Sequence, residues 1–310
     1  MDRRQVLLSG AAGIAAGSFV SPLIAAPEVG KKPFEFCLNT STIRGQKIPV
    51  EQEAEMAAKA GYQGFEPWIR ELQTHQQQGK SLKDLGKKLA DLGLKVESAI
   101  GFAKWIVDDD MERTKGLDEA KRDMEMVLTI GGKRIAAPPI GATNQKMTDF
   151  GKITQRYRTL ADLGSKIGII PELELWGFSK TLSRLGETVL VAMESAHPQA
   201  CILPDVYHLY KGESGFSGLN WLQGQAIGIF HMNDYPKSKP PATIVDADRV
   251  YPGDGDAPLV EILRQLRRIG YQGMLSLELF NPEYYKQDAY TVVKTGLEKM
   301  QQVVKNAMQW

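Results

Sequence analysis

The sequence predicts a single α/β domain with the architecture of a (β/α)8, or TIM, barrel. Short apolar runs of the β type alternate with longer stretches of helical periodicity, and eight such runs can be counted. The chain has 310 residues, 43% of them apolar, which is enough for one core of barrel size. Eight strands with helical crossovers favour a closed barrel over an open sheet.

The predicted elements alternate in a regular order. Strands are expected over residues 34–39, 64–67, 95–100, 134–137, 169–175, 201–204, 227–232 and 274–279. Helices are expected over residues 51–60, 82–92, 117–130, 153–167 and 259–269. A glycine follows each of these five helices, at Gly61, Gly93, Gly131, Gly168 and Gly270, where a helix end favours a residue that tolerates positive φ. The pattern predicts one barrel domain over residues 33–305.

The first 26 residues have the composition of an export signal peptide. Arg3 and Arg4 precede an apolar stretch that is shorter than the ~20 residues of a membrane-spanning helix, and the small residues Ala25 and Ala26 follow it. The paired arginines indicate a twin-arginine-like signal, a route for folded proteins. We therefore expect a periplasmic or otherwise exported protein, with no membrane anchoring after processing.

The charge balance excludes a strong electrostatic partner. The chain has 38 basic and 37 acidic residues, and removing the signal peptide leaves a formal net charge of zero. No nucleic-acid binding is expected, because a polyanion requires a positive field. Cys37 and Cys201 both lie in predicted strands and are expected to be buried free thiols. The oligomeric state stays open, and a homo-oligomer is compatible with the sequence.

Metal-ligand side chains mark the ends of the last four predicted strands: Glu174, Asp205, His231 and Glu278. Because a barrel brings these ends together, three carboxylates and an imidazole would meet where like charges repel unless a cation lies among them. One divalent metal ion is therefore expected. The donor set favours Mn²⁺, and Mg²⁺, Co²⁺ and Zn²⁺ are compatible with it. Taken singly, each carboxylate has a rim salt bridge as its alternative role, and the histidine has a structural role.

Further side chains near the predicted mouth are candidates for substrate contact. Glu66 ends the second strand and is expected to face the same mouth. Trp68, Trp105 and Trp176 follow the second, third and fifth strands, and their flat apolar faces suit a sugar ring. Ordinary packing is the alternative for the tryptophans. Asp234 follows the seventh strand and is expected to orient the imidazole of that strand, or else to brace the loop.

These residues resemble the xylose isomerase-like barrels, the sugar phosphate isomerase/epimerase superfamily that includes keto-sugar 3-epimerases and hydroxypyruvate isomerases. The resemblance covers about residues 33–305. It is most specific at Asp205-Val-Tyr-His208 and in YPGDGDAPLVEIL followed by GYQGMLSLELF. It implies that Glu174 and Glu278 both bind the metal and transfer protons. It also implies that Asp205 and His231 complete the coordination sphere and that His208 contacts the substrate.

Such a site suits a rearrangement through an enediolate. A metal that holds a ketone oxygen and the neighbouring hydroxyl makes the adjacent C–H acidic, and one glutamate then removes the proton. Its return on the opposite face gives an epimer, and its return to the neighbouring carbon gives an isomer. We expect a metal-dependent isomerase or epimerase of a small keto-sugar or hydroxypyruvate-like substrate. A lyase or hydratase of a keto-sugar or keto-glycoside is the alternative, because the same enediolate can expel a β-substituent.

Two other functions are less compatible with the sequence. Apurinic endonucleases of the same superfamily use further histidines, including an Asp-x-His after the seventh strand, whereas residues 247–251 here read Ala-Asp-Arg-Val-Tyr. A non-catalytic exported sugar-binding protein would use the tryptophans but would need no pair of opposed glutamates, so Glu174 and Glu278 speak against it. The loops after the first four strands do not identify the substrate.

Overall fold

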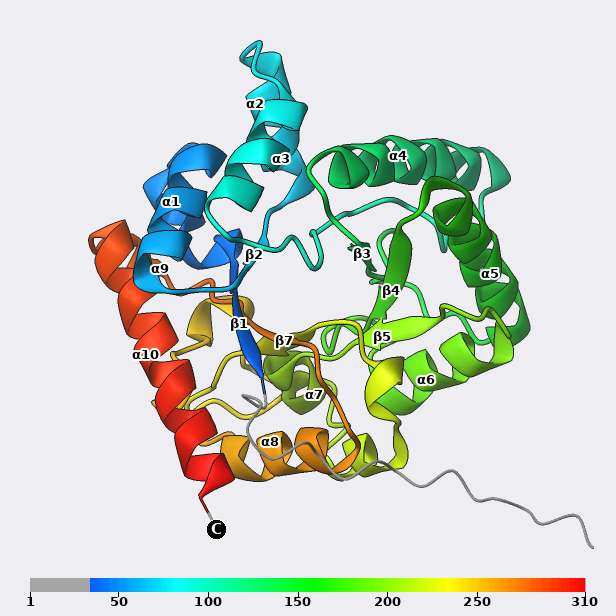
Figure 1. Ribbon diagram of the computed structural model, residues 1–310. Helices are drawn as coiled ribbons and strands as arrows, with labels where there is room; N and C mark the ends of the chain where they lie inside the picture. Colours follow the sequence, from blue (N-terminus) through cyan, green and yellow to red (C-terminus); the bar gives the residue numbers. More distant parts are fainter. Residues whose placement is uncertain (1–33, 310) are drawn as a thin grey trace, which may run out of the picture. The chain divides into compact units, whose positions relative to one another are not determined.

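Parallel strands surrounded by helices make up residues 34–309, the part of the chain that the computed structural model describes (Figure 1). These residues belong to one unit, Lys32–Trp310. The predicted signal peptide over residues 1–26 lies outside the described residues. Within the described part, no helix combines the length and the apolar character needed to cross a bilayer.

Seven strands of the described chain form hydrogen-bonded ladders, and every pairing is parallel. They are β1 (Glu35–Asn39), β2 (Gly64–Glu66), β3 (Arg134–Ala137), β4 (Ile170–Glu174), β5 (Cys201–Leu203), β6 (Phe230–Met232) and β7 (Met274–Leu277). The strand orders are β2-β1-β7-β6 and β3-β4-β5. Isolated bridges join β5 to the chain around β6, so the two groups of strands are continuous there.

The gap between β2 and β3 is filled by residues 95–100, which the sequence predicts to be a strand. They are extended but form no full ladder, because they bridge to the β2 region only through Lys95 and Ile100. Between these two points the neighbouring chain carries Pro67, which has no N–H to donate. On the other side, Ala99 accepts a hydrogen bond of 2.9 Å from β3. Eight extended segments thus form a ring, and the prediction of a (β/α)8 barrel is confirmed.

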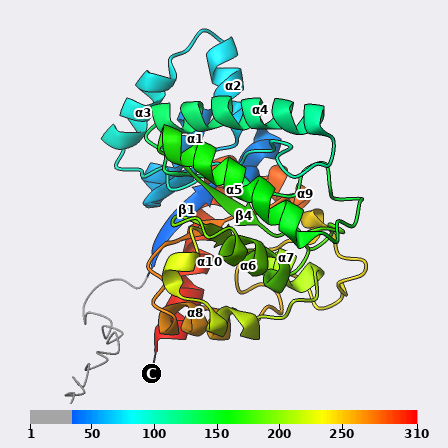
Figure 2. The same cartoon turned by 90° about the vertical axis from the view of Figure 1, so that its right-hand side faces the viewer.

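Helices cover the outside of this ring. They are α1 (Val50–Ala60), α2 (Ile69–Gln77), α3 (Leu82–Asp91), α4 (Asp110–Thr129), α5 (Phe150–Ile167), α6 (Leu185–Glu194), α7 (Val206–Lys211), α8 (Leu259–Arg268), α9 (Pro282–Tyr285) and α10 (Ala289–Met308), with 3-10 turns η1 (Thr40–Gln46), η2 (Ser217–Trp221), η3 (Gly224–Ala226) and η4 (Asp246–Asp248). Helices α4, α5 and α6 lie side by side (Figure 2), and α10 packs against both α8 and α1. The last helix thereby closes the layer against the first.

The predicted ends of the five helices agree with the structure, whereas the predicted starts of two of them do not. All five glycines expected after helices have positive φ. Helices α4 and α5 begin earlier than predicted, because Asp109 and Asp149 cap them by accepting hydrogen bonds from backbone N–H groups of the first turn. Cys37 and Cys201 are buried and free, as expected.

Candidate active site

Three predicted metal ligands meet at the carboxyl ends of neighbouring strands. Asp205 follows β5, His231 lies in β6 and Glu278 follows β7, and one donor atom from each lies within 4.8 Å of the others. The parallel bridge between Asp205 and His231 sets their side chains next to each other. None of the three residues is more than 3% exposed, so the cluster is shielded from bulk water.

The two ring nitrogens of His231 have different surroundings. Nε2 lies 3.1 Å from Oε2 of Glu66, which fixes the orientation of the ring. Nδ1 lies 3.2 Å from Oε2 of Glu278 and 3.8 Å from Oδ2 of Asp205. The imidazole therefore presents Nδ1 to the two carboxylates. A carboxylate that holds the far nitrogen of a metal-binding histidine is a common arrangement in metal sites.

Glu174 lies outside the group of three, and the hydrogen bonds of two buried polar atoms near it are incomplete even though Nδ1 of His231 lies close to Glu278. Among the described residues, Nδ1 of His231 and Oε2 of Glu174 are buried without a hydrogen-bond partner. Glu174 ends β4 and is 3% exposed. Because an unpaired buried polar atom is costly, such atoms at one site call for an additional ligand. An oxygen-rich set with one nitrogen suits a divalent metal ion.

The charges of the cluster are strongly coupled. Burial raises the pKa of Glu174 well above its usual value, and the charge of Glu278 raises it further. Burial acts on the pKa of Glu278 in the same direction, but the positive charges of His231 and Arg249 outweigh it and lower that pKa to about 2. Burial lowers the pKa of His231, and the carboxylates of Glu278 and Glu66 more than reverse this. The carboxylates thus need a nearby positive charge, the role that a metal ion would take.

Arg249 is the main polar residue that the sequence did not single out. It is 1% exposed, and its Nη1 donates to Oδ2 of Asp205 at 2.9 Å and to Oε2 of Glu278 at 2.8 Å. Its Nη2 lies 3.3 Å from Nε2 of His208. The guanidinium group therefore contacts two predicted metal ligands and the predicted substrate-binding histidine at once.

His208 lies beside the cluster as a neutral imidazole. Burial lowers its pKa to about 3 and outweighs the attraction of Asp205, which raises it, while the charge of Arg249 lowers it further. Its Nδ1 accepts a hydrogen bond of 3.3 Å from the backbone N–H of Gly177. The ring of Trp176 lies 6.4 Å from the imidazole, between centroids. A neutral histidine in this position can exchange hydrogen bonds with hydroxyl groups.

Aromatic rings gather near these polar groups. Trp68 packs against Phe102 at 5.0 Å and against Phe280 at 6.0 Å, and Phe102 lies 6.3 Å from Trp176. Trp105 packs in the core, which favours the packing alternative left open by the sequence. It is 1% exposed, donates to a backbone carbonyl through Nε1 and packs edge-on against a core tyrosine.

Glu66 contacts His231 at the ring nitrogen opposite to the one that faces Asp205 and Glu278. It is fully buried, and its Oε2 accepts hydrogen bonds from Asn39 at 2.9 Å and from Ser276 at 2.6 Å in addition to its contact with His231. Its surroundings therefore fit the positioning of the imidazole better than the direct substrate contact that the sequence predicts. Asp234 does not reach the imidazole. It accepts hydrogen bonds from four backbone N–H groups and so braces the loop after β6.

A family model described as "Xylose isomerase-like TIM barrel" matches residues 54–303. The chain belongs to this family. The resemblance seen in the sequence motifs is thereby confirmed.

Relatives of this xylose isomerase-like barrel include a named isomerase and proteins of known structure. Inosose isomerase from Bacillus velezensis is 26% identical over 274 residues, which cover 87% of this chain and 97% of that protein. The solved structure of the IolI protein with a bound zinc atom has a TM-score of 0.82 at 23% identity, covering 89% of this chain and 100% of that one. The structure of L-ribulose 3-epimerase has a TM-score of 0.69 at 16% identity, covering 88% and 95%. At these identities the structural similarity establishes the fold.

In this xylose isomerase-like barrel, the search for metal-ligand side chains at the ends of predicted strands found the acidic residues and the histidine of the centre. It missed several of their neighbours. Asn39 ends β1 and was detectable by the same rule. Its Oδ1 accepts from Nε1 of Trp68 at 2.9 Å, and its Nδ2 donates to both Glu66 and Glu278. Arg249 lies far along the loop after β6, where position relative to a strand gave no signal.

Proposed function

We propose that this protein is a metal-dependent isomerase or epimerase that acts through an enediolate on a small keto-sugar or hydroxypyruvate-like substrate. The observation that carries the proposal is the buried group of Asp205, His231 and Glu278, whose donor atoms all lie within 4.8 Å of one another. The names of the relatives, an inosose isomerase and an L-ribulose 3-epimerase, support the same class of reaction.

Glu174, Asp205, His231 and Glu278 would hold the metal. A bound divalent ion would polarise the substrate carbonyl and so acidify the neighbouring C–H bond. The donor set favours Mn²⁺. Zn²⁺ belongs in the same test because a zinc atom is present in the IolI structure.

The two glutamates are suited to proton transfer on opposite faces of a substrate. Glu174 ends β4 in the strand group β3-β4-β5, and Glu278 follows β7 in the group β2-β1-β7-β6. They therefore approach the centre from different parts of the barrel. One carboxylate removes the proton beside the carbonyl, and the other returns a proton to the opposite face, which inverts that carbon. Return to the neighbouring carbon gives the isomer.

Arg249 and His208 supply the remaining polar contacts. The guanidinium of Arg249 lies against Glu278 and is positioned to stabilise negative charge as it develops on the substrate oxygens. His208, as a neutral imidazole, can hydrogen-bond a substrate hydroxyl. Trp176 and Phe178 flank this imidazole and shield it from water on one side.

Export is a separate proposal. The composition of residues 1–26 supports a twin-arginine-like signal peptide and a periplasmic or otherwise exported mature protein. Cell fractionation, compared with a variant in which Arg3 and Arg4 are both changed to lysine, tests it. Retention of the variant in the cytoplasm is expected, and equal export of both forms would contradict the proposal.

The reaction class is tested by metal analysis and product identification. The purified protein is expected to bind one equivalent of Mn²⁺ or Zn²⁺, measured by inductively coupled plasma mass spectrometry after dialysis. Keto-sugars and an inosose are then incubated with the loaded protein, and products are assigned by NMR. An epimer or aldose–ketose isomer supports the proposal, whereas an unsaturated product identifies the lyase alternative. Binding of sugar without turnover of any of these compounds would support a sugar-binding protein instead.

A further inference from the structure

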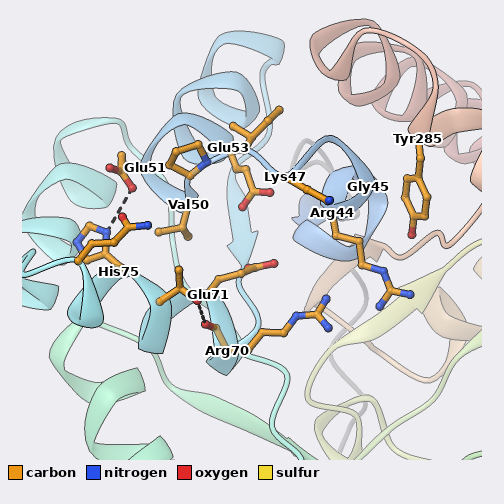
Figure 3. Close-up of a pocket in the computed structure, with 14 residues that line it drawn as sticks. Arg44, Gly45, Lys47, Val50, Glu51, Glu53, Arg70, Glu71, His75 and Tyr285 are labelled. Carbon is orange, nitrogen blue, oxygen red and sulfur yellow. Dashed lines mark hydrogen bonds and ion pairs between the residues drawn. The ribbon is translucent and has the colours of Figure 1, made fainter.

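A cavity close to the site contains two arginines without acidic partners. It has a volume of about 490 Å³ and is lined by residues of η1, α1 and α2, together with Tyr285 (Figure 3). Arg44 and Arg70 both line it, and in Figure 3 their guanidinium groups extend in the same direction. Within residues 34–309, neither guanidinium forms an ion pair with a carboxylate. Arg70 and Arg44 lower the pKa of the nearby Glu71 without forming an ion pair with it.

Both arginines are held against one aromatic ring. The guanidinium carbon of Arg44 lies 5.4 Å from the ring centroid of Trp68, and that of Arg70 lies 4.4 Å from it. Stacking on an aromatic face orients a guanidinium while it leaves the N–H groups at the edge of its plane free to donate. Two arginines arranged in this way form a pair of donors suited to an oxyanion.

This pair is connected to the candidate active site through direct contacts. Nε1 of Trp68 donates to Asn39, which in turn donates to Oε1 of Glu278 at 3.2 Å. Arg44 also lies 4.7 Å from the ring of Phe280, and the guanidinium of Arg249 lies 4.9 Å from the same ring. The ring of Phe280 is thus in contact with both Arg44 and Arg249.

Three glutamates, Glu51, Glu53 and Glu71, line the cavity together with the arginines. Burial raises the pKa of Glu53 to about 9, and the charge of Glu71 raises it further, so Glu53 is a neutral acid at pH 7. Burial also raises the pKa of Glu71, against hydrogen bonds donated by Thr40 and the backbone of Trp68. Glu51 is already paired with a lysine and a histidine. The charges of Arg70 and Arg44 act on Glu71 in the opposite direction and lower its pKa.

We propose that Arg44 and Arg70 form a subsite for an anionic group of the substrate, a carboxylate or a phosphate. The substrate would then be a sugar acid or a sugar phosphate whose ketone lies at the centre while its charged group contacts the arginines. This inference rests on the proposed function for the position of the ketone. The binding of the anion itself requires only the two arginines.

Three probes of the same carbon skeleton test the subsite. D-Fructose is neutral, 2-keto-D-gluconate carries a carboxylate in place of the C1 hydroxymethyl group, and D-fructose 6-phosphate carries a phosphate at the other end. Their dissociation constants are measured by calorimetry on the metal-loaded protein. We expect at least one anionic probe to bind about tenfold or more tightly than D-fructose, since hydrogen bonds to charged groups are the strong ones. The probe that gains affinity distinguishes carboxylate from phosphate recognition.

Variants assign the preference to the two arginines. Arg44→Gln and Arg70→Gln are each expected to reduce the affinity for the anionic probe about tenfold. Both variants should bind D-fructose with unchanged affinity. Arg267→Gln is the matched control, because Arg267 is exposed near the end of α8 that precedes β7, at the opposite end of the barrel. Equal affinity for all three probes, or a preference that survives both arginine variants, would overturn the inference.

Binding and turnover are read separately, so the two proposals can fail independently. If an anionic probe binds through the arginines but no probe exchanges the proton beside its carbonyl, the proposed reaction fails and the subsite stands. If neutral ketones are turned over and the arginine variants change nothing, the reaction stands and the subsite fails.

Discussion

Replacement of Glu66 by glutamine tests how the centre positions its histidine. Glu66 is expected to hold Nε2 of His231 so that Nδ1 faces the metal. Its carboxylate also accepts from Asn39 and Ser276, so all of its contacts come from donors. A glutamine amide has one oxygen and one NH₂ group. Whichever way it is placed, one donor faces another, and the imidazole loses part of its support.

The Glu66→Gln substitution is expected to lower the affinity for the metal. Changes to groups that orient a metal-binding histidine weaken metal binding by about 10- to 100-fold. This corresponds to about 1.4 to 2.7 kcal/mol of binding free energy. Mn²⁺ titration by calorimetry at fixed pH measures the dissociation constant directly, with circular dichroism as the check that the barrel is intact.

Glu53→Gln is the matched control for this experiment. Glu53 is 1% exposed, so Glu53→Gln makes the same substitution at a similarly buried position. Glu53 lies in α1 and contacts none of the predicted metal ligands. We expect its Mn²⁺ affinity to equal that of the unchanged protein. A Glu66→Gln variant that folds normally and binds Mn²⁺ as tightly as the control would refute the positioning role.

Three further outcomes are expected. Glu174→Gln and Glu278→Gln should each slow turnover by about 100- to 10,000-fold while the fold is kept, because each removes a proton-transfer group; full activity in either variant, measured by NMR, would contradict the mechanism. Arg249→Gln should lower kcat by about 100-fold with the metal still bound; loss of the metal, seen by mass spectrometry, would show that the arginine holds the site together instead. Glu53→Gln should become more stable relative to the unchanged protein as pH rises from about 5 to 9. In the unfolded chain the carboxyl ionises near its usual pKa, whereas the folded value is about 9, so only the unchanged protein loses stability, by at most about 1.4 kcal/mol per pH unit. Urea unfolding at several pH values measures this, and parallel curves would disprove it.

The sequence predicted most of the centre because its residues end strands. Glu174, Asp205, His231 and Glu278 each lie at or next to the carboxyl end of a strand, and barrel closure then brings these ends together. The same rule could not give the contacts of each strand-end residue. Glu66 also ends a strand, but its hydrogen bonds with Asn39, Ser276 and His231 depend on how neighbouring strands place their side chains.

The directions of side chains in irregular segments could not be predicted from the sequence, for a related reason. Trp105 follows the predicted third strand, yet the chain there turns its ring into the core. Arg249 is brought to the centre by a loop that folds back on itself, with an antiparallel bridge between Asp234 and Val250. Contacts of this kind depend on the path of a loop, and neither periodicity nor strand-end position encodes that path.

The central claim is that a divalent metal held by these strand ends allows the removal of a proton beside a carbonyl. The most direct measurement is deuterium incorporation at that carbon, followed by NMR in D₂O for a panel of keto-sugars and an inosose, with metal-free and Mn²⁺-loaded protein. We expect exchange that requires the metal and disappears in Glu278→Gln. Absence of exchange with every compound despite bound metal, or equal exchange without metal, would contradict the claim.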